Sequence, residues 1–302
     1  MRDQLHTEHN TFPSSFYPAV AMMGTDLLKA AELREPETGE VLSFLAARPV
    51  HTVVMASFIK DNGLRSKLNR GRFYGFRNAE GRLEGVALIG HTTLIEARTD
   101  DALRSFALQA RSSETPIHLI MSHGTSASEF WGYYSDGFSE PRLTCTERLF
   151  EVSFPFMVRK SGRTVRLAAA EDLLQVAEAQ AVIAFMECGV DPLAKDREGF
   201  LKRVLRRIEQ GRVFVVFENG KLVFKADVIA DTTVTAYLEG IYVAPEYRGR
   251  GIGSDCLAEV TLSLLDRVEN VCLLSNVEFN DTHKTYIKVG YRPSDECTTL
   301  FV

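Results

Sequence analysis

The chain has 302 residues, enough for two domains of ordinary size, and 45% of them are hydrophobic while 25% are charged. This balance indicates a folded globular protein and excludes an intrinsically disordered one. The net charge of −5 argues against a general nucleic-acid binder, and no apolar run approaches the ~20 residues that a membrane-spanning helix needs.

The five cysteines, Cys145, Cys188, Cys256, Cys272 and Cys297, are widely spaced and never arranged as Cys-x-x-Cys. This usage predicts reduced thiols packed as small hydrophobic side chains, as in a cytoplasmic protein. The seven histidines add no metal-ligand spacing, so we expect no metal site. The polar N-terminus lacks the apolar core of a secretory signal, which also favours the cytoplasm.

The first half of the chain begins with an expected leader at residues 1–34, where a polar stretch precedes a short apolar segment. After it, apolar residues recur at helical spacing in some segments and form short β-branched or alternating runs in others. This pattern predicts helices at 40–45 and 51–59, strands at 72–76, 83–90 and 92–97, a helix at 101–110, a strand at 117–121, a helix at 126–134 and a closing strand at 142–150.

The second half repeats this order of helices, a three-strand meander, helix, strand, helix and strand. The repeat predicts one α/β fold used twice, with the boundary near residues 155–162, where proline and glycine interrupt two apolar strands. Asn219-Gly220 predicts a type I′ hairpin inside the second meander. The expected elements are a strand at 164–167, helices at 171–186 and 197–209, strands from 213 and at 222–230 and 233–243, a helix from 252, a strand at 271–275, a helix at 282–289 and final strands to 302.

The stretch 237–265 joins a strand to a helix through a glycine-rich turn. Pro245 ends the strand because proline cannot donate to a sheet ladder, and apolar residues four apart from Ile252 predict the helix. The turn between them, residues 248–253, reads Arg-Gly-Arg-Gly-Ile-Gly. Unpaired N–H groups at a helix N-terminus attract anions, and glycines allow a phosphate to approach the backbone closely. The spacing is neither that of a Walker A loop nor that of a dinucleotide-binding turn.

This Arg-x-x-Gly-x-Gly pattern, with Arg248, Gly251 and Gly253 at its fixed positions, resembles the acetyl-CoA pyrophosphate loop of the GNAT N-acetyltransferase superfamily. The resemblance implies an α/β (α+β) fold of two tandem GNAT-like domains, each a mixed, mostly antiparallel central sheet flanked by helices. Residues 160–302 would form the catalytic domain, with acetyl-CoA as the co-substrate. The loop residues expected to bind it are Arg248, Gly249, Arg250, Gly251, Ile252 and Gly253.

Residues 35–157 would form a degenerate GNAT-like domain. At the place that matches the glycine-rich loop, the first half has residues 96–101, Glu-Ala-Arg-Thr-Asp-Asp. This segment contains no glycine and puts two acids where an anion would lie. We therefore expect this domain to be structural or to shape the acceptor site.

The resemblance also implies a bulged strand before the loop, whose free backbone groups at Ile241, Tyr242 and Val243 pair with the pantetheine arm. Tyr286 matches the superfamily tyrosine that protonates the departing thiolate; the alternative is a tyrosine packed on its helix. Glu239 is the candidate base, since strand propensity disfavours glutamate there; it would accept the amine proton, hold a cationic substrate, or simply pair with an arginine.

Two asparagines complete the predicted cofactor-binding set. Asn276 follows an apolar strand and would bind the pantetheine or end the strand. Asn280 lies one residue after the position where superfamily members often carry an asparagine, so a helix cap is its alternative role.

These residues predict an acetyl-CoA-dependent N-acetyltransferase that moves an acetyl group to a primary amine by direct attack in a ternary complex, because no Cys–His pair suggests an acetyl-enzyme. The alternatives are a non-catalytic acyl-CoA-binding sensor or an assembly protein on the same fold. The acceptor, a small-molecule, protein or peptide amine, and the oligomeric state stay open.

Overall fold

The computed structural model describes residues 29–135, 137, 139–154 and 162–302. The predicted leader lies outside the described residues apart from residues 29–34, and so does most of the predicted boundary between the halves.

The first half contains the predicted elements in the predicted order, with small shifts at their ends, and adds one strand, β1, within the predicted leader. Its elements are β1 (Ala31–Glu32), α1 (Thr38–Leu45), α2 (Val53–Asn62), β2 (Gly71–Arg77), β3 (Leu83–Gly90), β4 (Thr92–Ala97), α3 (Asp100–Arg111), β5 (Leu119–His123), α4 (Ser126–Tyr134) and β6 (Leu143–Val152).

The second half repeats that order, and its predicted hairpin is confirmed. Asn219 and Gly220 both have the positive φ that a type I′ turn requires, 51° and 75°. Its elements are β7 (Arg166–Leu167), α5 (Leu173–Cys188), α6 (Pro192–Lys195), α7 (Arg197–Glu209), β8 (Val213–Glu218), β9 (Lys221–Asp231), β10 (Thr235–Val243), α8 (Ile252–Leu265), β11 (Asn270–Asn276), α9 (Asn280–Val289) and β12 (Arg292–Phe301).

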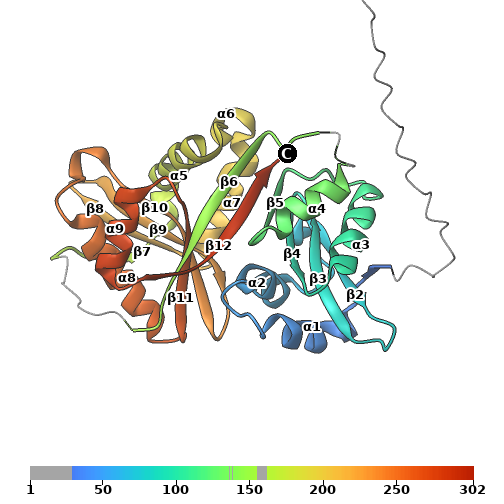
Figure 1. Cartoon of the computed structure of the whole chain (residues 1–302). Coiled ribbons are helices and arrows are strands. Elements are labelled where there is room, and N and C mark those ends of the chain that lie inside the picture. The colour runs from blue at the N-terminus through green and yellow to red at the C-terminus, as the bar shows by residue number, and fades with distance from the viewer. Residues whose placement is uncertain (1–28, 136, 138, 155–161) are drawn as a thin grey trace, which may run out of the picture.

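The described strands form one twelve-stranded sheet in the order β1-β2-β3-β4-β5-β12-β6-β11-β10-β9-β8-β7. Only β4–β5 and β10–β11 pair in parallel, so the sheet is mixed and mostly antiparallel, as the sequence predicts. Figure 1 shows the two halves side by side, with the blue and green first half to the right of the orange second half.

The two halves exchange their last strands. The first-half strand β6 lies between β11 and β12, where Phe150 stands opposite Leu273. The second-half strand β12 pairs with β5 of the first half, where Cys297 stands opposite His123. Figure 1 shows β6 in pale green among the strands of the second half. Each half therefore completes the sheet of the other.

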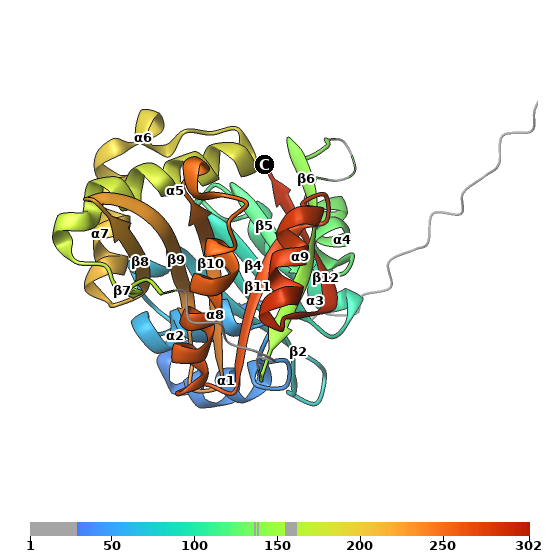
Figure 2. The same cartoon turned by 90° about the vertical axis from the view of Figure 1, so that its left-hand side faces the viewer.

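Helices cover both faces of this sheet. In the second half, α5 and α7 pack on one face and α8 and α9 on the other, which faces the viewer in Figure 2. The first half repeats this arrangement, with α1 and α2 on one face and α3 and α4 on the other. Helix α2 also packs against β9 and β10, and Arg212 forms a two-pronged ion pair with Asp61 at 2.6 and 2.9 Å. The halves are thus joined by helix packing as well as by strand exchange.

Candidate active site

The glycine-rich turn connects β10 to α8 and presents an open backbone. Gly249 and Gly251 have φ values of 73° and 80°, in the left-handed region that favours glycine. Gly251 is the N-cap of α8, so no side chain caps this helix. Within the described part of the chain, the N–H groups of residues 249–253 donate no hydrogen bond. The turn therefore offers a row of unpaired donors at a helix N-terminus, as an anion site requires.

The space beside these donors is empty of side chains. A Cβ atom added at Gly249 would meet no atom within 4 Å, and one at Gly251 would meet only the Asp255 carboxylate at 3.9 Å. At Gly253 an added Cβ would lie 3.0 Å from Val243 Cγ2, so this third glycine lets the helix pack closely on the end of β10. Gly249 and Gly251 thus leave open space beside the backbone, whereas Gly253 allows close packing.

Three basic residues surround this turn. Arg248 Nε donates to the carbonyl of Val243 at 2.9 Å, which ties the arginine to the end of the strand. The Arg250 guanidinium lies 6.0 Å from the Tyr247 ring. Lys288 of α9 donates to Ser254 Oγ at 3.1 Å, so it reaches the first turn of α8. The sequence motif gave no signal for Lys288, which comes close only through the packing of α9 on α8.

The strand before the turn is bulged, as the resemblance implies. Glu239 stands opposite Asp227 and Tyr242 opposite Lys225, so two residues of β10, Gly240 and Ile241, face one residue of β9. Gly240 has a φ of 59°, and this left-handed residue bends the strand.

Strands β10 and β11 also part at this point. Their parallel pairing ends at Leu238 and Leu273, although β11 continues to Asn276 beside β6. The backbone of Ile241, Tyr242 and Val243 therefore has no β11 partner and lies at the opening. This is the place where a ligand arm can add to the strand.

A buried lysine holds the bulge. Lys225 is fully buried, and its Nζ donates to the carbonyl of Gly240 at 2.9 Å and to Gln180 Oε1 at 2.6 Å. The same Nζ lies 2.9 Å from Asp227 Oδ1, and Arg207 donates to Asp227 Oδ2 at 2.8 Å. Burial lowers the pKa of Lys225, which the adjacent Asp227 carboxylate opposes. The sequence analysis did not predict this network. Its one signal in the sequence was the presence of two charged residues, Lys225 and Asp227, in an otherwise apolar strand.

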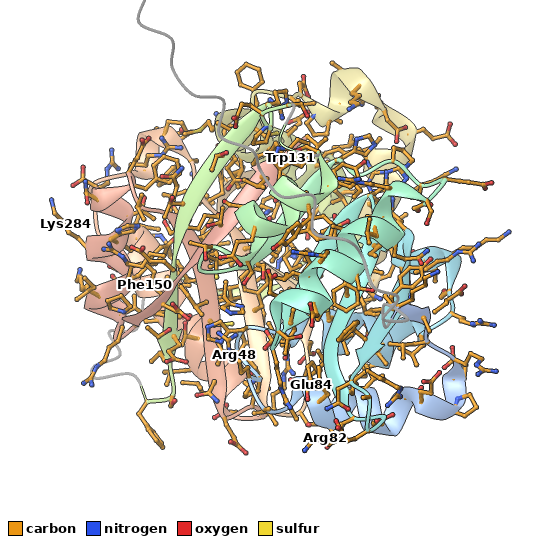
Figure 3. The ribbon with its side chains drawn as sticks, turned by 45° about the vertical axis from the view of Figure 1, so that its right-hand side comes forward. Arg48, Arg82, Glu84, Trp131, Phe150 and Lys284 are labelled. Carbon is orange, nitrogen blue, oxygen red and sulfur yellow. The ribbon has the colours of Figure 1, made fainter. Side chains whose placement is uncertain are left out.

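Tyr286 lies on the α8 and α9 side of the opening. Its ring packs edge-on against Phe150 with centroids 5.4 Å apart, and its side chain is hydrogen-bonded to Ser275. Ser275 belongs to the part of β11 that no longer pairs with β10. Burial raises the pKa of Tyr286, so the phenol stays protonated. Figure 3 marks Phe150 on β6, so this contact crosses between the halves of the chain.

Glu239 lies on the opposite face. Its neighbour Leu238 is in register with Leu273 and so shares the face of Phe150 and Tyr286, and alternation turns Glu239 toward α5 and α7. Burial raises the pKa of Glu239, while the positive charge of Arg207 partly opposes that shift. A carboxylate with a raised pKa suits a general base.

The two predicted asparagines occupy different environments. Asn276 ends β11, and its Oδ1 accepts from the N–H of Glu278 at 2.9 Å, so the side chain also turns the chain. Asn280 is exposed and is the first residue of α9, whose N-cap is Phe279, so it is not the helix cap. A ligand role for either residue stays a prediction.

The first half has a similar opening between two parallel strands but lacks the glycine-rich turn. Strands β4 and β5 likewise stop pairing at Leu94 and Met121. The following helix α3 is capped by Thr99, whose hydroxyl accepts from the N–H of Ala102 at 3.3 Å, and two aspartates occupy its first turn. The Thr99 hydroxyl thus bonds to a free N–H group of this helix N-terminus, and the two aspartates place negative charge beside it. An anion would not be attracted there, which supports the expectation that the first half lacks the cofactor loop.

Across the described residues, no group of three His, Cys, Asp or Glu side chains is arranged to hold a metal ion. The helices of the described ranges are all too short or too polar to cross a membrane.

Comparison with protein-family models matches residues 209–293 to a domain described as acetyltransferase (GNAT) domain. The matched range includes the bulged strand, the glycine-rich turn and Tyr286. Comparison with curated proteins gives no match.

Several solved structures share the fold of the whole chain. An X-ray structure of a Drosophila protein has a TM-score of 0.65 at 12% identity and covers 90% of this chain and 98% of its own. A GNAT-family acetyltransferase from Colwellia psychrerythraea has a TM-score of 0.57 at 13% identity, with 90% and 98% covered. A tandem GNAT protein from the clavulanic acid biosynthesis pathway has a TM-score of 0.56 at 13% identity, with 90% and 97% covered. The predicted tandem fold is therefore confirmed.

Proposed function

We propose that this chain, a GNAT-superfamily protein with the fold of tandem GNAT proteins, is an acetyl-CoA-dependent N-acetyltransferase that acetylates a primary amine by direct attack. The observation that carries the proposal is the opening between β10 and β11, which has the unpaired N–H groups of residues 249–253 at one end and Glu239 and Tyr286 on either side. The open, basic loop fits a diphosphate, and acetyl-CoA supplies an acetyl group activated as a thioester.

We assign the role of each residue from its position at the turn, on the strand edge or on one of the two faces of the sheet. The loop would bind the diphosphate, and the backbone at Ile241–Val243 would hold the pantetheine arm as an added strand. Glu239 would accept a proton from the amine as the new C–N bond forms. Tyr286, on the other face, would give its proton to the sulfur as the C–S bond breaks. Base and acid act from opposite sides, which suits direct attack in a ternary complex.

Two measurements on the full chain test the proposal. We expect acetyl-CoA to raise the melting temperature, and we expect thiol release that depends on added amine. A coenzyme-induced shift without thiol release across a broad amine panel would favour an acyl-CoA sensor. Absence of any shift at saturating acetyl-CoA would favour an assembly protein and would refute the proposal.

Tyr286→Phe is expected to lower kcat by roughly a hundredfold, at the low end of what a general acid contributes, because water protonates the thiolate less well. The KM for acetyl-CoA should stay the same, since the ring still packs on Phe150. Tyr291→Phe is the matched control: Tyr291 is also buried, but its hydroxyl bonds to Thr261 at 2.8 Å. Equal losses in both variants would show a packing effect and count against the acid role.

The pH dependence of kcat/KM provides a test of Glu239. Because burial raises the pKa of Glu239 and the base must be ionised, activity should rise with pH along a limb displaced above the ordinary glutamate pKa of about 4.3. The charge of Arg207 stabilises the ionised form, so Arg207→Gln should move this limb to higher pH. The control is Arg206→Gln, because Arg206 bonds to Asn62 instead. A limb that stays in place in Arg207→Gln would exclude Glu239 as the titrating group.

A further inference from the structure

Helix α2 lies where the two halves of the chain meet (Figure 1), and an apolar pocket lies between it and the sheet. The walls of the pocket come from α2, from β4 and β5 of the first half, from the exchanged strands β6 and β12, and from β10 and β11 of the second half. Most of the wall is aliphatic and includes Val54, Met55, Leu94, Met121, Leu149 and Leu274. The glycine-rich turn at residues 248–253 takes no part in it, so the pocket is separate from the proposed diphosphate site.

One glutamate in this pocket occupies the same place in the first half as Glu239 in the second. Leu94 of β4 and Tyr237 of β10 each lie within the last two residues of a parallel strand pairing, and both line the pocket. Side chains two apart on a strand point to the same face. Glu96 therefore follows Leu94 on the pocket face, as Glu239 follows Tyr237. The first half keeps a carboxylate where the second half has its candidate base, although it lacks the glycine-rich turn.

The Glu96 carboxylate is buried but only loosely bonded. Glu96 is 5% exposed and lines the pocket. Among the described residues, Arg48 Nη1 lies 3.4 Å from each of its two oxygens, and His123 Nδ1 lies 3.8 Å from Oε2. A charge-assisted N–H bond to a carboxylate is ordinarily about 2.7–2.9 Å long, and a carboxylate has about four acceptor sites. Glu96 can therefore accept further N–H donors from a molecule in the pocket, which would offset the cost of its burial.

The charges at this end of the pocket favour a cation over an anion. Arg48 is shared between two carboxylates, since it lies 3.4 Å from Glu96 and 3.6 Å from Asp295. Arg48 Nη1 also lies 2.9 Å from His123 Nε2, and His51 Nε2 lies 2.8 Å from Asp295 Oδ2. Burial and the charge of Arg48 lower the pKa of His123, which favours its neutral form. While both histidines are neutral, these five side chains carry one net negative charge, which would repel a carboxylate and attract an ammonium group.

We propose that this pocket binds a primary amine with a short, branched aliphatic body, at a site separate from acetyl transfer. The ammonium group donates to Glu96, and the aliphatic body lies against the wall of the pocket. The first half binds this amine without acetylating it, because the N-terminus of α3 offers no glycine-rich turn to a coenzyme. Since strands of both halves line the pocket, the amine contacts both of them and stabilises their association.

The test titrates isoamylamine into the full chain without acetyl-CoA and follows the methyl signals of methionine by NMR. Met55 and Met121 line the pocket, and the variants Met55→Leu and Met121→Leu identify their signals. Both signals should shift with increasing amine, while the signal of Met186, which is exposed on α5, should stay in place. Isoamyl alcohol and isocaproate have nearly the same shape but no ammonium group. Both should bind at least about tenfold more weakly, because the charge-assisted bond to Glu96 is lost.

Two variants locate the ammonium group. Glu96→Gln should weaken the binding of isoamylamine at least about tenfold, whereas Glu239→Gln should leave the shifts of Met55 and Met121 unchanged, because Glu239 does not line the pocket. If Glu96→Gln fails to fold, the comparison of the amine with the alcohol on the native chain decides.

The amine site is refuted if the signals of Met55 and Met121 stay in place at about 50 mM isoamylamine, well above a millimolar Kd. Equal binding of the amine, the alcohol and the carboxylate would also overturn it, since the pocket would then select only for an apolar body. These measurements use no coenzyme, so failure of the amine site leaves the acetyltransferase function intact, and failure of thiol release leaves the amine site intact.

Discussion

Gly251→Ala is expected to lower kcat/KM for acetyl-CoA by roughly a hundred- to a thousandfold, because the loop would lose two or more hydrogen bonds to a charged group, each contributing about 1.5–3 kcal/mol. Gly251 has a φ of 80°, which an alanine adopts only at a cost of about 1–2 kcal/mol. The turn would relax toward negative φ and turn its N–H groups away from the diphosphate. The added methyl group would also occupy open space beside the loop, where only the Asp255 carboxylate lies within 4 Å.

The control for this variant is Gly220→Ala in the β8–β9 hairpin. Gly220 has a φ of 75° and, like Gly251, has room for a methyl group, so the two substitutions impose nearly the same backbone strain. Both should lower the melting temperature by a similar amount, but only Gly251→Ala should raise the KM for acetyl-CoA. Native-like coenzyme binding by Gly251→Ala would refute the assignment of this turn as the diphosphate site.

The strand, glycine-rich turn and helix of the candidate site were predictable from sequence because their signals are local. The glycines, the arginine and the proline of residues 245–253 fix a strand end, a turn and a helix start within one short stretch. The repeated order of helices and strands likewise predicted that one fold is used twice. Each element could be recognised from the spacing of its own apolar residues.

The rest of the candidate site was not predictable, because it depends on contacts between distant segments. Phe150 lies in the half without the glycine-rich turn, and only strand exchange brings its ring against Tyr286. Lys225 gives a weak signal in sequence, yet its contact with the carbonyl of Gly240 holds the bulge. Both depend on sheet pairing over long separations, which no local pattern encodes. The predicted domain ranges stay a prediction. Because the two halves exchange their last strands, we expect the stability of each half to depend on the other.

A fragment of residues 160–302, the predicted catalytic domain, is expected to bind no acetyl-CoA and to show no cooperative unfolding. Both neighbours of β12 in the sheet, β5 and β6, belong to the first half, so the fragment leaves β12 unpaired and one edge of β11 open. It also loses the buried side chain of Phe150, which packs on Tyr286. Loss of one such phenylalanine costs about 3–5 kcal/mol, against a total stability of about 5–15 kcal/mol for a domain. Unpaired strand edges would further promote aggregation.

A longer fragment, residues 142–302, isolates the cause because it retains β6 and lacks the rest of the first half. Here β6 again separates β11 from β12, and the opening between β10 and β11 keeps its support. We expect this fragment to recover an acetyl-CoA-induced rise in melting temperature, and co-expression of residues 1–157 with residues 160–302 to recover thiol release as well. If the short fragment bound acetyl-CoA as tightly as the full chain, β6 would be dispensable. The catalytic half would then be a self-sufficient domain, and the exchange of strands would be only a way of joining two halves.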